Sequence, residues 1–226
     1  MKLLLASNSG EPFYEWLEDE LMRFVDGKDV TFVSAATVYS TSQYFKIVKE
    51  KLNALEIKVK HLELDKNPED LIEKTEIFLV GGGNTYNLLN NLQKYKLIDK
   101  IQAKVRNGAK YIGISAGANI AGLTILTAND WNVVGGTNFK GLELVKFNIN
   151  PHYIEPHDKA VFSGETRDER ILEHLVFNSQ PVVAIEEKTL IEINGKDIKV
   201  RGKGKAKVFK KGQEPKIFKS GENFVV

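Results

Sequence analysis

The sequence predicts an α/β protein whose mostly parallel sheet is sandwiched by helices, with an antiparallel β extension at the C-terminus. Short apolar runs alternate with amphipathic segments from Lys2 to Asn119. This rhythm favours parallel strands that are covered on both faces by the intervening helices. The last quarter instead carries short strands and tight turns, such as Asn194-Gly195 within 190–200. With 226 residues, 42% of them hydrophobic, the chain can bury a sizeable core.

Each element is predicted from a local signal. A helix is expected to start at Asn67-Pro68, because asparagine caps a helix and proline suits its first position. Gly27 and Gly108 are expected to end helices. The apolar runs predict strands over 2–6, 30–36, 57–64, 77–80, 111–114 and 181–185. The amphipathic segments predict helices over 12–26, 42–55 and 85–106, the last in two pieces.

Composition narrows the function class. We expect one domain over 1–226, with the β hairpins of about 188–226 as an appendage. Net charge is only +2, so we expect neither nucleic acid nor a membrane as partner. The basic segment 201–207 is interpreted as lysines on edge strands, which discourage edge-to-edge pairing. There is no cysteine, which excludes disulfides and a cysteine nucleophile. A cytoplasmic monomer or homodimer is the expectation.

The strongest motif is Gly113-Ile-Ser-Ala-Gly117, which follows a buried strand and precedes a small-residue helix start. It fits the G-x-S-x-G pattern of a nucleophile elbow, in which small residues flank a serine on a strained turn. The N–H of Ala116 would then face a developing oxyanion. Alternatively, Ser115 only caps the helix.

A nucleophilic serine needs a base, and the base needs an acid to orient it. Among the four histidines, His152 directly follows an apolar strand and a proline, and His157 lies close by. Spacing alone leaves both open. Asp130, beside Trp131, is the candidate acid, although it could equally form an Asx-turn in a loop.

The glycine run Gly81-Gly-Gly-Asn-Thr85 has two interpretations. It could bind phosphate at a helix N-terminus, but it lacks the lysine and serine or threonine of a Walker loop. Alternatively, an N–H of the run, assigned to Gly83, supplies the second oxyanion donor opposite Ala116. The second interpretation suits a neighbouring serine elbow better. Asn84 and Thr85 are predicted to contact the substrate.

Six blocks in order resemble the peptidase E family of serine peptidases, the α-aspartyl dipeptidases. They are 3–9, 80–85, 111–119, 124–130, 149–152 and 164–171. The resemblance implies an α/β sandwich related to class I glutamine amidotransferases. It also implies hydrolysis of small peptides with an N-terminal aspartate, without a metal or other cofactor.

By this resemblance, Ser115 matches the nucleophile, Asp130 the triad acid and His152 the base, which favours His152 over His157. Arg167 matches the arginine that binds the substrate's aspartyl carboxylate, and a guanidinium fork suits that task. Ile114 replaces a tryptophan common in bacterial members, which would alter the pocket wall. Two alternatives remain: another hydrolase on this scaffold, esterase or cyanophycinase-like, and an inactive module that binds acidic peptides.

Overall fold

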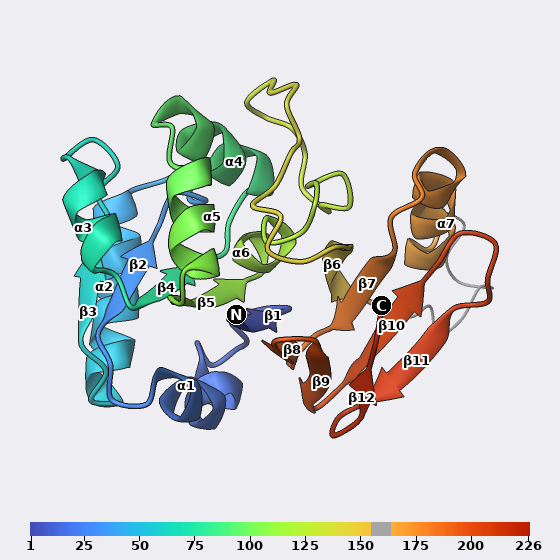
Figure 1. Ribbon diagram of the computed structural model, residues 1–226, viewed down its shortest axis with the longest axis horizontal. Helices are drawn as coiled ribbons and strands as arrows, with labels where there is room; N and C mark the ends of the chain where they lie inside the picture. Colours follow the sequence, from blue (N-terminus) through green and yellow to red (C-terminus); the bar gives the residue numbers. More distant parts are fainter. Residues whose placement is uncertain (155–163) are drawn as a thin grey trace.

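The computed structural model describes residues 1–154 and 164–226, and in this part of the chain the strands form two sheets (Figure 1). The larger sheet has the order β12-β9-β8-β1-β5-β4-β2-β3, and the smaller has the order β11-β10-β7-β6. The predicted α/β class with a mostly parallel sheet is confirmed. The strands are β1 (Lys2–Ala6), β2 (Val30–Val33), β3 (Val59–His61), β4 (Ile77–Val80), β5 (Lys110–Ile114), β6 (Asn148–Tyr153), β7 (Val182–Glu186), β8 (Thr189–Asn194), β9 (Asp197–Gly202), β10 (Lys205–Phe209), β11 (Lys216–Lys219) and β12 (Asn223–Phe224).

Parallel pairing brings the ends of the central strands to one edge. β1 lies parallel to β5, β5 to β4, and β4 to β2. In the smaller sheet, β6 is likewise parallel to β7. Ligands of such sheets bind beyond the carboxyl ends of the strands. The residues that follow β1, β4, β5 and β7, together with the end of β6, are therefore the place to seek a site.

Successive side chains of a strand point to opposite faces, and both faces of β1 are buried in this way. Leu3 and Leu5 pack with residues of α3, α4 and α5. Leu4 and Ala6 pack with residues of α1 and α2. The helices are η1 (Glu15–Leu17), α1 (Glu18–Val25), α2 (Thr41–Ala54), α3 (Pro68–Lys74), α4 (Thr85–Lys94), α5 (Ile98–Arg106), α6 (Ala116–Asn119) and α7 (Arg167–Phe177).

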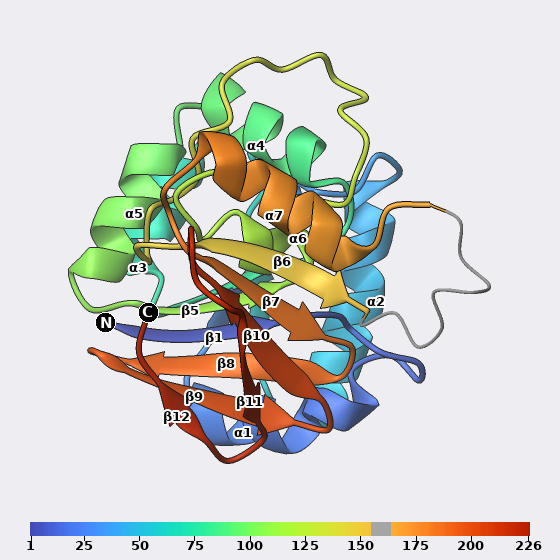
Figure 2. The same cartoon turned by 90° about the vertical axis from the view of Figure 1, so that its right-hand side faces the viewer.

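The smaller sheet is also covered on both sides. Val183 and Ile185 of β7 belong to the main core, whereas Val182 and Ala184 pack with Ile171 of α7. Figure 2 shows α7 lying across this sheet. The helix starts with a capping box in which Thr166 and Glu169 satisfy each other's backbone N–H. Position 167 is thereby fixed at a helix start.

The C-terminal strands are more integrated than an appendage would be. β8 pairs antiparallel with β1 through five residue pairs, so the 189–202 hairpin extends the larger sheet. β10 pairs with β7 and thus belongs to the smaller sheet. The apolar run predicted as a strand over 181–185 is β7, also in the smaller sheet. The predicted strand over 30–36 ends at Val33.

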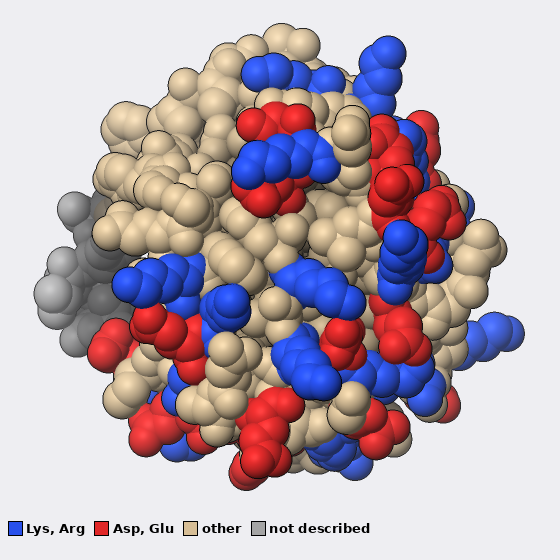
Figure 3. Space-filling model, turned by 90° about the vertical axis from the view of Figure 1, so that its left-hand side faces the viewer, with Lys and Arg blue, Asp and Glu red and all other residues tan. Residues whose placement is uncertain are grey.

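Acidic and basic side chains lie intermixed on the face opposite the smaller sheet (Figure 3). A representative pair is Lys100 of α5 with Glu69 of α3, 2.7 Å apart and both exposed. Such solvated pairs contribute little to stability. Across the described residues, the helices are too short or too polar to cross a bilayer.

The glycines of the elbow are required by close packing. A Cβ on Gly117 would lie 2.1 Å from the carbonyl oxygen of Val80, and one on Gly113 would lie 2.3 Å from the carbonyl oxygen of Gly117. Both obstacles are backbone atoms, which cannot rotate away. The elbow therefore tolerates no side chain at either position without a shift of β4, β5 or α6.

This predicts a stability difference between two glycine variants. Gly117→Ala should lower the free energy of unfolding by about 1–3 kcal/mol or more, because the added methyl overpacks the backbone of β4. Gly136→Ala is the control, since its Cβ would meet only a methyl of Val134 at 3.9 Å. Denaturant unfolding of both variants checks this. Equal stability would contradict the packing argument.

Candidate active site

Ser115 sits on the strained turn that its motif predicts. It follows β5 directly, with φ 54° and ψ −110°, a left-handed conformation that costs a non-glycine residue about 1–3 kcal/mol. Its N–H donates to the carbonyl of Ala6, which ends the β1–β5 ladder, and its carbonyl accepts from Ala118 and Asn119. The turn therefore places the Ser115 hydroxyl beyond the carboxyl end of β5, at the start of α6.

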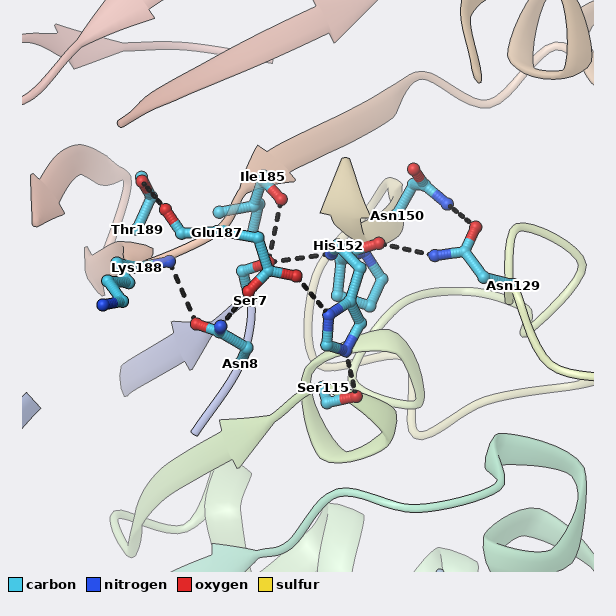
Figure 4. A network of polar contacts seen from close by, with 11 residues as sticks. Ser7, Asn8, Ser115, Asn129, Asn150, His152, Ile185, Glu187, Lys188 and Thr189 are labelled. Atoms are coloured by element: carbon cyan, nitrogen blue, oxygen red, sulfur yellow. Dashed lines mark hydrogen bonds and ion pairs between the residues drawn. The ribbon is translucent and has the colours of Figure 1, made fainter. Parts of the chain in front are cut away.

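His152 is turned toward Ser115 by a bulge in β6. The register with β7 shifts between Asn150 and Tyr153, and His152 has φ 54°. A bulge re-aims a side chain that regular pairing would leave elsewhere. Its Nε2 lies 2.7 Å from Ser115 Oγ (Figure 4). The structure therefore brings the predicted serine and histidine into hydrogen-bond contact.

A carboxylate fixes the tautomer of this histidine. His152 Nδ1 lies 2.6 Å from Glu187 Oε1, just beyond the end of β7. An ionised carboxylate only accepts hydrogen bonds, so Nδ1 carries the proton and Nε2 accepts from the Ser115 hydroxyl. The side chains of His152 and Glu187 are 39% and 43% exposed. Water can compete for Glu187, so its orientation depends on other contacts.

Those contacts come from the segment that follows β1. Asn8 Nδ2 donates to Glu187 Oε2, while the N–H of Lys188 donates to Asn8 Oδ1 at 3.0 Å. The second bond sets which end of the amide faces the carboxylate. Glu187 thus uses one oxygen for His152 and the other for Asn8 (Figure 4).

Ser7 holds the backbone under the histidine. Its fully buried hydroxyl accepts from the N–H of His152 at 2.7 Å and donates to the carbonyl of Ile185 at 2.9 Å. Its own N–H donates to the carbonyl of Thr189. One residue at the end of β1 therefore contacts β6, β7 and β8.

Asp130 does not occupy the position predicted for it. Its Oδ2 accepts from the N–H of Thr85 at 2.8 Å and from the Thr85 hydroxyl at 2.5 Å, at the start of α4. Both ring nitrogens of His152 are engaged by Ser115 and Glu187. The expectation that Asp130 orients His152 is therefore corrected: among the residues described, Glu187 makes that contact.

Asn84 and Thr85 hold this neighbouring segment. Asn84 caps α4 by accepting from the N–H of Asn87, and its Nδ2 donates to the carbonyl of Trp131 at 2.9 Å. Thr85 uses its N–H and hydroxyl on Asp130. These contacts place the Asp130–Trp131 segment beside the glycine loop. Their predicted contact with substrate stays a prediction.

The glycine loop lies against the nucleophile. A Cβ on Gly82 would sit 3.2 Å from Ser115 Cβ, whereas Gly83 packs on the carbonyl of Ala36. The N–H of Gly82 donates to the Tyr44 hydroxyl at 3.1 Å. Burial raises the pKa of this phenol, which keeps it protonated. Within the described structure, the N–H groups of Gly83 and Ala116 have no hydrogen-bond partner, so both predicted oxyanion donors are available.

Arg167 lines a pocket of about 390 Å³ between α7 and the 126–131 segment. Burial, and after it the charge of Arg170, lowers the pKa of Arg167. Arg170 lines the same pocket but is 58% exposed and lies 3.6 Å from Glu165. Arg167 makes no ion pair or hydrogen bond with any described residue. A half-buried guanidinium without a partner favours an incoming anion.

The other histidines take structural positions where they are described. His61 contacts the Ser34 hydroxyl and stacks on Phe45. His174 lies near Asn148 and Asn178 on α7. His157, the alternative base, lies outside the described residues.

Sequence reasoning assigned no role to Glu187, Ser7 or Asn8. A usable signal existed for each of them. Glu187 follows a run correctly predicted as a buried strand, and Ser7-Asn8 follows the first strand, so both stand at carboxyl ends. Tyr44, the partner of Gly82, lies within a helix and gives no such signal.

A serine, a histidine and an orienting carboxylate at the carboxyl ends of parallel strands define the arrangement of a serine hydrolase. Comparison with known proteins identifies the family within this class. The model of peptidase family S51 matches residues 3–201. The chain therefore belongs to peptidase family S51, a family of serine peptidases.

Its relatives match over most of their length. Peptidase E of Nostoc sp. is 36% identical, over 98% of this chain and 94% of the relative. A probable alpha-aspartyl dipeptidase of Drosophila melanogaster is 35% identical, over 92% of this chain and 89% of the relative. Among solved structures, a putative peptidase E of Listeria monocytogenes has a TM-score of 0.69 at 25% identity, covering 89% of this chain and 98% of the other. A peptidase from an acI-B1 actinobacterium has a TM-score of 0.77 at 18% identity, covering 100% and 96%, and supports the fold alone.

The contact between Asn8 and Glu187 leads to a prediction. Asn8→Ala should slow covalent labelling of Ser115 by a fluorophosphonate about 10- to 100-fold. Without the bond from Asn8, Glu187 no longer holds the His152 imidazole in the orientation that accepts the Ser115 proton. Asn53→Ala, an exposed asparagine of α2, is the matched control. Labelling rates measured by gel fluorescence check this. If Asn8→Ala labels as fast as Asn53→Ala, Asn8 does not position the carboxylate.

Proposed function

We propose that this protein is a serine dipeptidase that hydrolyses dipeptides with an N-terminal aspartate, using Ser115, His152 and Glu187. The observation that carries the proposal is the continuous contact from Ser115 Oγ through His152 to Glu187. Membership of peptidase family S51 supports the choice of substrate, as does Arg167, which lines the pocket and has no partner among the described residues. The name of the Drosophila relative, probable alpha-aspartyl dipeptidase, points the same way.

Because His152 carries its proton on Nδ1, its Nε2 can act as the base in acylation. Ser115 Oγ attacks the peptide carbonyl carbon while its proton passes to His152 Nε2. Glu187 stabilises the imidazolium that forms. The N–H groups of Ala116 and Gly83 receive the carbonyl oxygen as it becomes negative. The C–N bond then breaks, Nε2 gives its proton to the leaving amine, and an aspartyl ester of Ser115 remains.

Deacylation reverses these roles with water. A water molecule loses a proton to His152 Nε2 and attacks the ester carbonyl. The bond to Ser115 Oγ breaks, and Oγ recovers the proton from Nε2. Aspartate leaves, and the enzyme is restored without an external proton donor or a metal.

Arg167 selects the acidic side chain. Desolvating a carboxylate is unfavourable unless a cation meets it, and Arg167 is half-buried, charged and unpaired within the described structure. Its fork can hold both carboxylate oxygens. Its place in the first turn of α7, after the Thr166 capping box, keeps the backbone of this residue fixed.

The first test separates a working triad from an inactive binding module. Glu187→Gln should lower kcat for an aspartyl dipeptide by about two to four decades, because the neutral amide stabilises neither the tautomer nor the imidazolium. Ser115→Ala should abolish fluorophosphonate labelling, and Glu214→Gln, an exposed glutamate, should act as wild type. Steady-state kinetics measure this. Normal turnover by folded Glu187→Gln would refute the assigned acid.

The second test concerns specificity. Arg167→Ala should lower kcat/KM for Asp-Leu by about two to four decades, the effect expected when a desolvated charge loses its partner at roughly 3–5 kcal/mol. Hydrolysis of Ala-Leu or of a p-nitrophenyl ester, the substrate of the rival esterase, should change far less.

Two further variants test whether the loss of activity comes from the missing guanidinium group of Arg167. Arg167→Lys should recover only part of the activity, since it restores charge without the fork. Arg170→Ala, one turn further along α7 and more exposed, should have a small effect. Equal losses on acidic and neutral substrates would show that Arg167 supports the fold rather than binding the aspartyl side chain.

A further inference from the structure

Two opposite charges line one pocket without touching. Asp130 and Arg167 both face the pocket of about 390 Å³ between α7 and the 126–131 segment. In the part of the chain that the structure describes, neither forms an ion pair. Asp130 uses only Oδ2, on Thr85, and its Oδ1 has no hydrogen bond there. The pocket thus offers one anionic and one cationic group, each with bonding capacity left.

Asp130 is fixed between the two halves of the catalytic machinery. Thr85 ties it to the glycine loop that packs on Ser115. Its neighbour Asn129 donates to the carbonyl of Pro151 at 2.6 Å, next to His152 in β6 (Figure 4). Asp130 is thus connected, through Thr85 and Asn129, to segments that flank Ser115 and His152, whereas both ring nitrogens of His152 are already engaged.

A second acceptor lies in the same lining. Asn150 is buried, and its Nδ2 donates to the carbonyl of Thr127 and to Asn129 Oδ1. Its Oδ1 has no partner among the described residues. This acceptor is itself buried, so the recognition of a ligand's ammonium group falls to Asp130, whose Oδ1 has no hydrogen bond among the described residues.

An N-terminal aspartyl residue carries the matching groups. Its α-ammonium is carried by Cα, which is bonded to the carbonyl that Ser115 attacks, and its side-chain carboxylate is carried by the adjacent Cβ. We infer that Asp130 binds the α-ammonium of the substrate while Arg167 binds the side-chain carboxylate. This inference rests on the proposed dipeptidase function. It makes the free N-terminus a condition for hydrolysis, and it gives Asp130 a task separate from the Ser115–His152–Glu187 contact.

The test uses two chromogenic substrates that differ only in the amino group, aspartate α-p-nitroanilide and succinate mono-p-nitroanilide. Wild type should cleave the first at least about a hundredfold faster, because a site built for a hydrogen-bonding group rejects the analogue that lacks it. Asp130→Asn keeps the side-chain shape but loses the charge. It should cut kcat/KM on the aspartyl substrate on the order of 100-fold and leave the succinyl substrate within about twofold.

Fluorophosphonate labelling distinguishes a role of Asp130 in substrate binding from a role in the triad or the fold. Asp130→Asn should label at nearly the wild-type rate, since the probe carries no amino group. Asp99→Asn, the same change in the first turn of α5, is the matched control and should act as wild type throughout.

Three outcomes overturn the inference. Equal losses of Asp130→Asn on both anilides and on the probe would assign Asp130 to the triad or the fold. Equal cleavage of both anilides by wild type would show that the ammonium is not recognised. Wild-type labelling without cleavage of either anilide would instead refute the dipeptidase function, and this inference with it, a pattern distinct from the other two.

Discussion

The site depends on the double hydrogen bond of the Ser7 hydroxyl. Ser115 follows a strand of the larger sheet, whereas His152 lies in a strand of the smaller sheet and Glu187 directly follows another, so nothing in either sheet alone fixes their separation. Ser7 directly follows β1, the strand beside β5, and bonds the backbone of both His152 and Ile185. Because it is fully buried, losing either bond would leave polar groups unsatisfied away from water. That penalty couples the sheets where the chemistry requires a fixed distance.

The backbone is strained at both residues of the Ser115–His152 contact. Ser115 and His152 each adopt φ 54°, which neither would prefer in isolation. At Ser115, the close approach of Gly117 to Val80 holds the turn. At His152, the bulge in β6 and the bond to Ser7 do so. The strained conformations persist because neighbouring backbone leaves no alternative, and they aim both side chains at one point.

Prediction from sequence succeeded where the signal is local. Periodicity and turn residues gave the fold class and most element positions, and the flanking glycines marked Ser115. The pairing of β6 and β7 in a separate sheet is a long-range event that no local pattern encodes. Glu187 therefore went unnoticed, and Asp130, near the right edge of the sheet, was taken for the orienting acid. A one-residue bulge is equally invisible to periodicity, yet it decides where His152 points.

Ile114 and Trp131, two residues next to predicted site residues, differ in what their side chains can contact. Ile114, expected to alter the pocket wall, is buried in the core that faces α1 and α2, opposite the smaller sheet. Its side chain therefore acts on packing beneath the elbow and not on substrate. Trp131 is 84% exposed and lines the same pocket as Asp130 and Arg167. Its carbonyl is held by Asn84, so the backbone is fixed while the indole stays free in solvent. If the pocket binds the aspartyl residue as proposed, this exposed aromatic offers apolar surface to the part of the substrate that follows it.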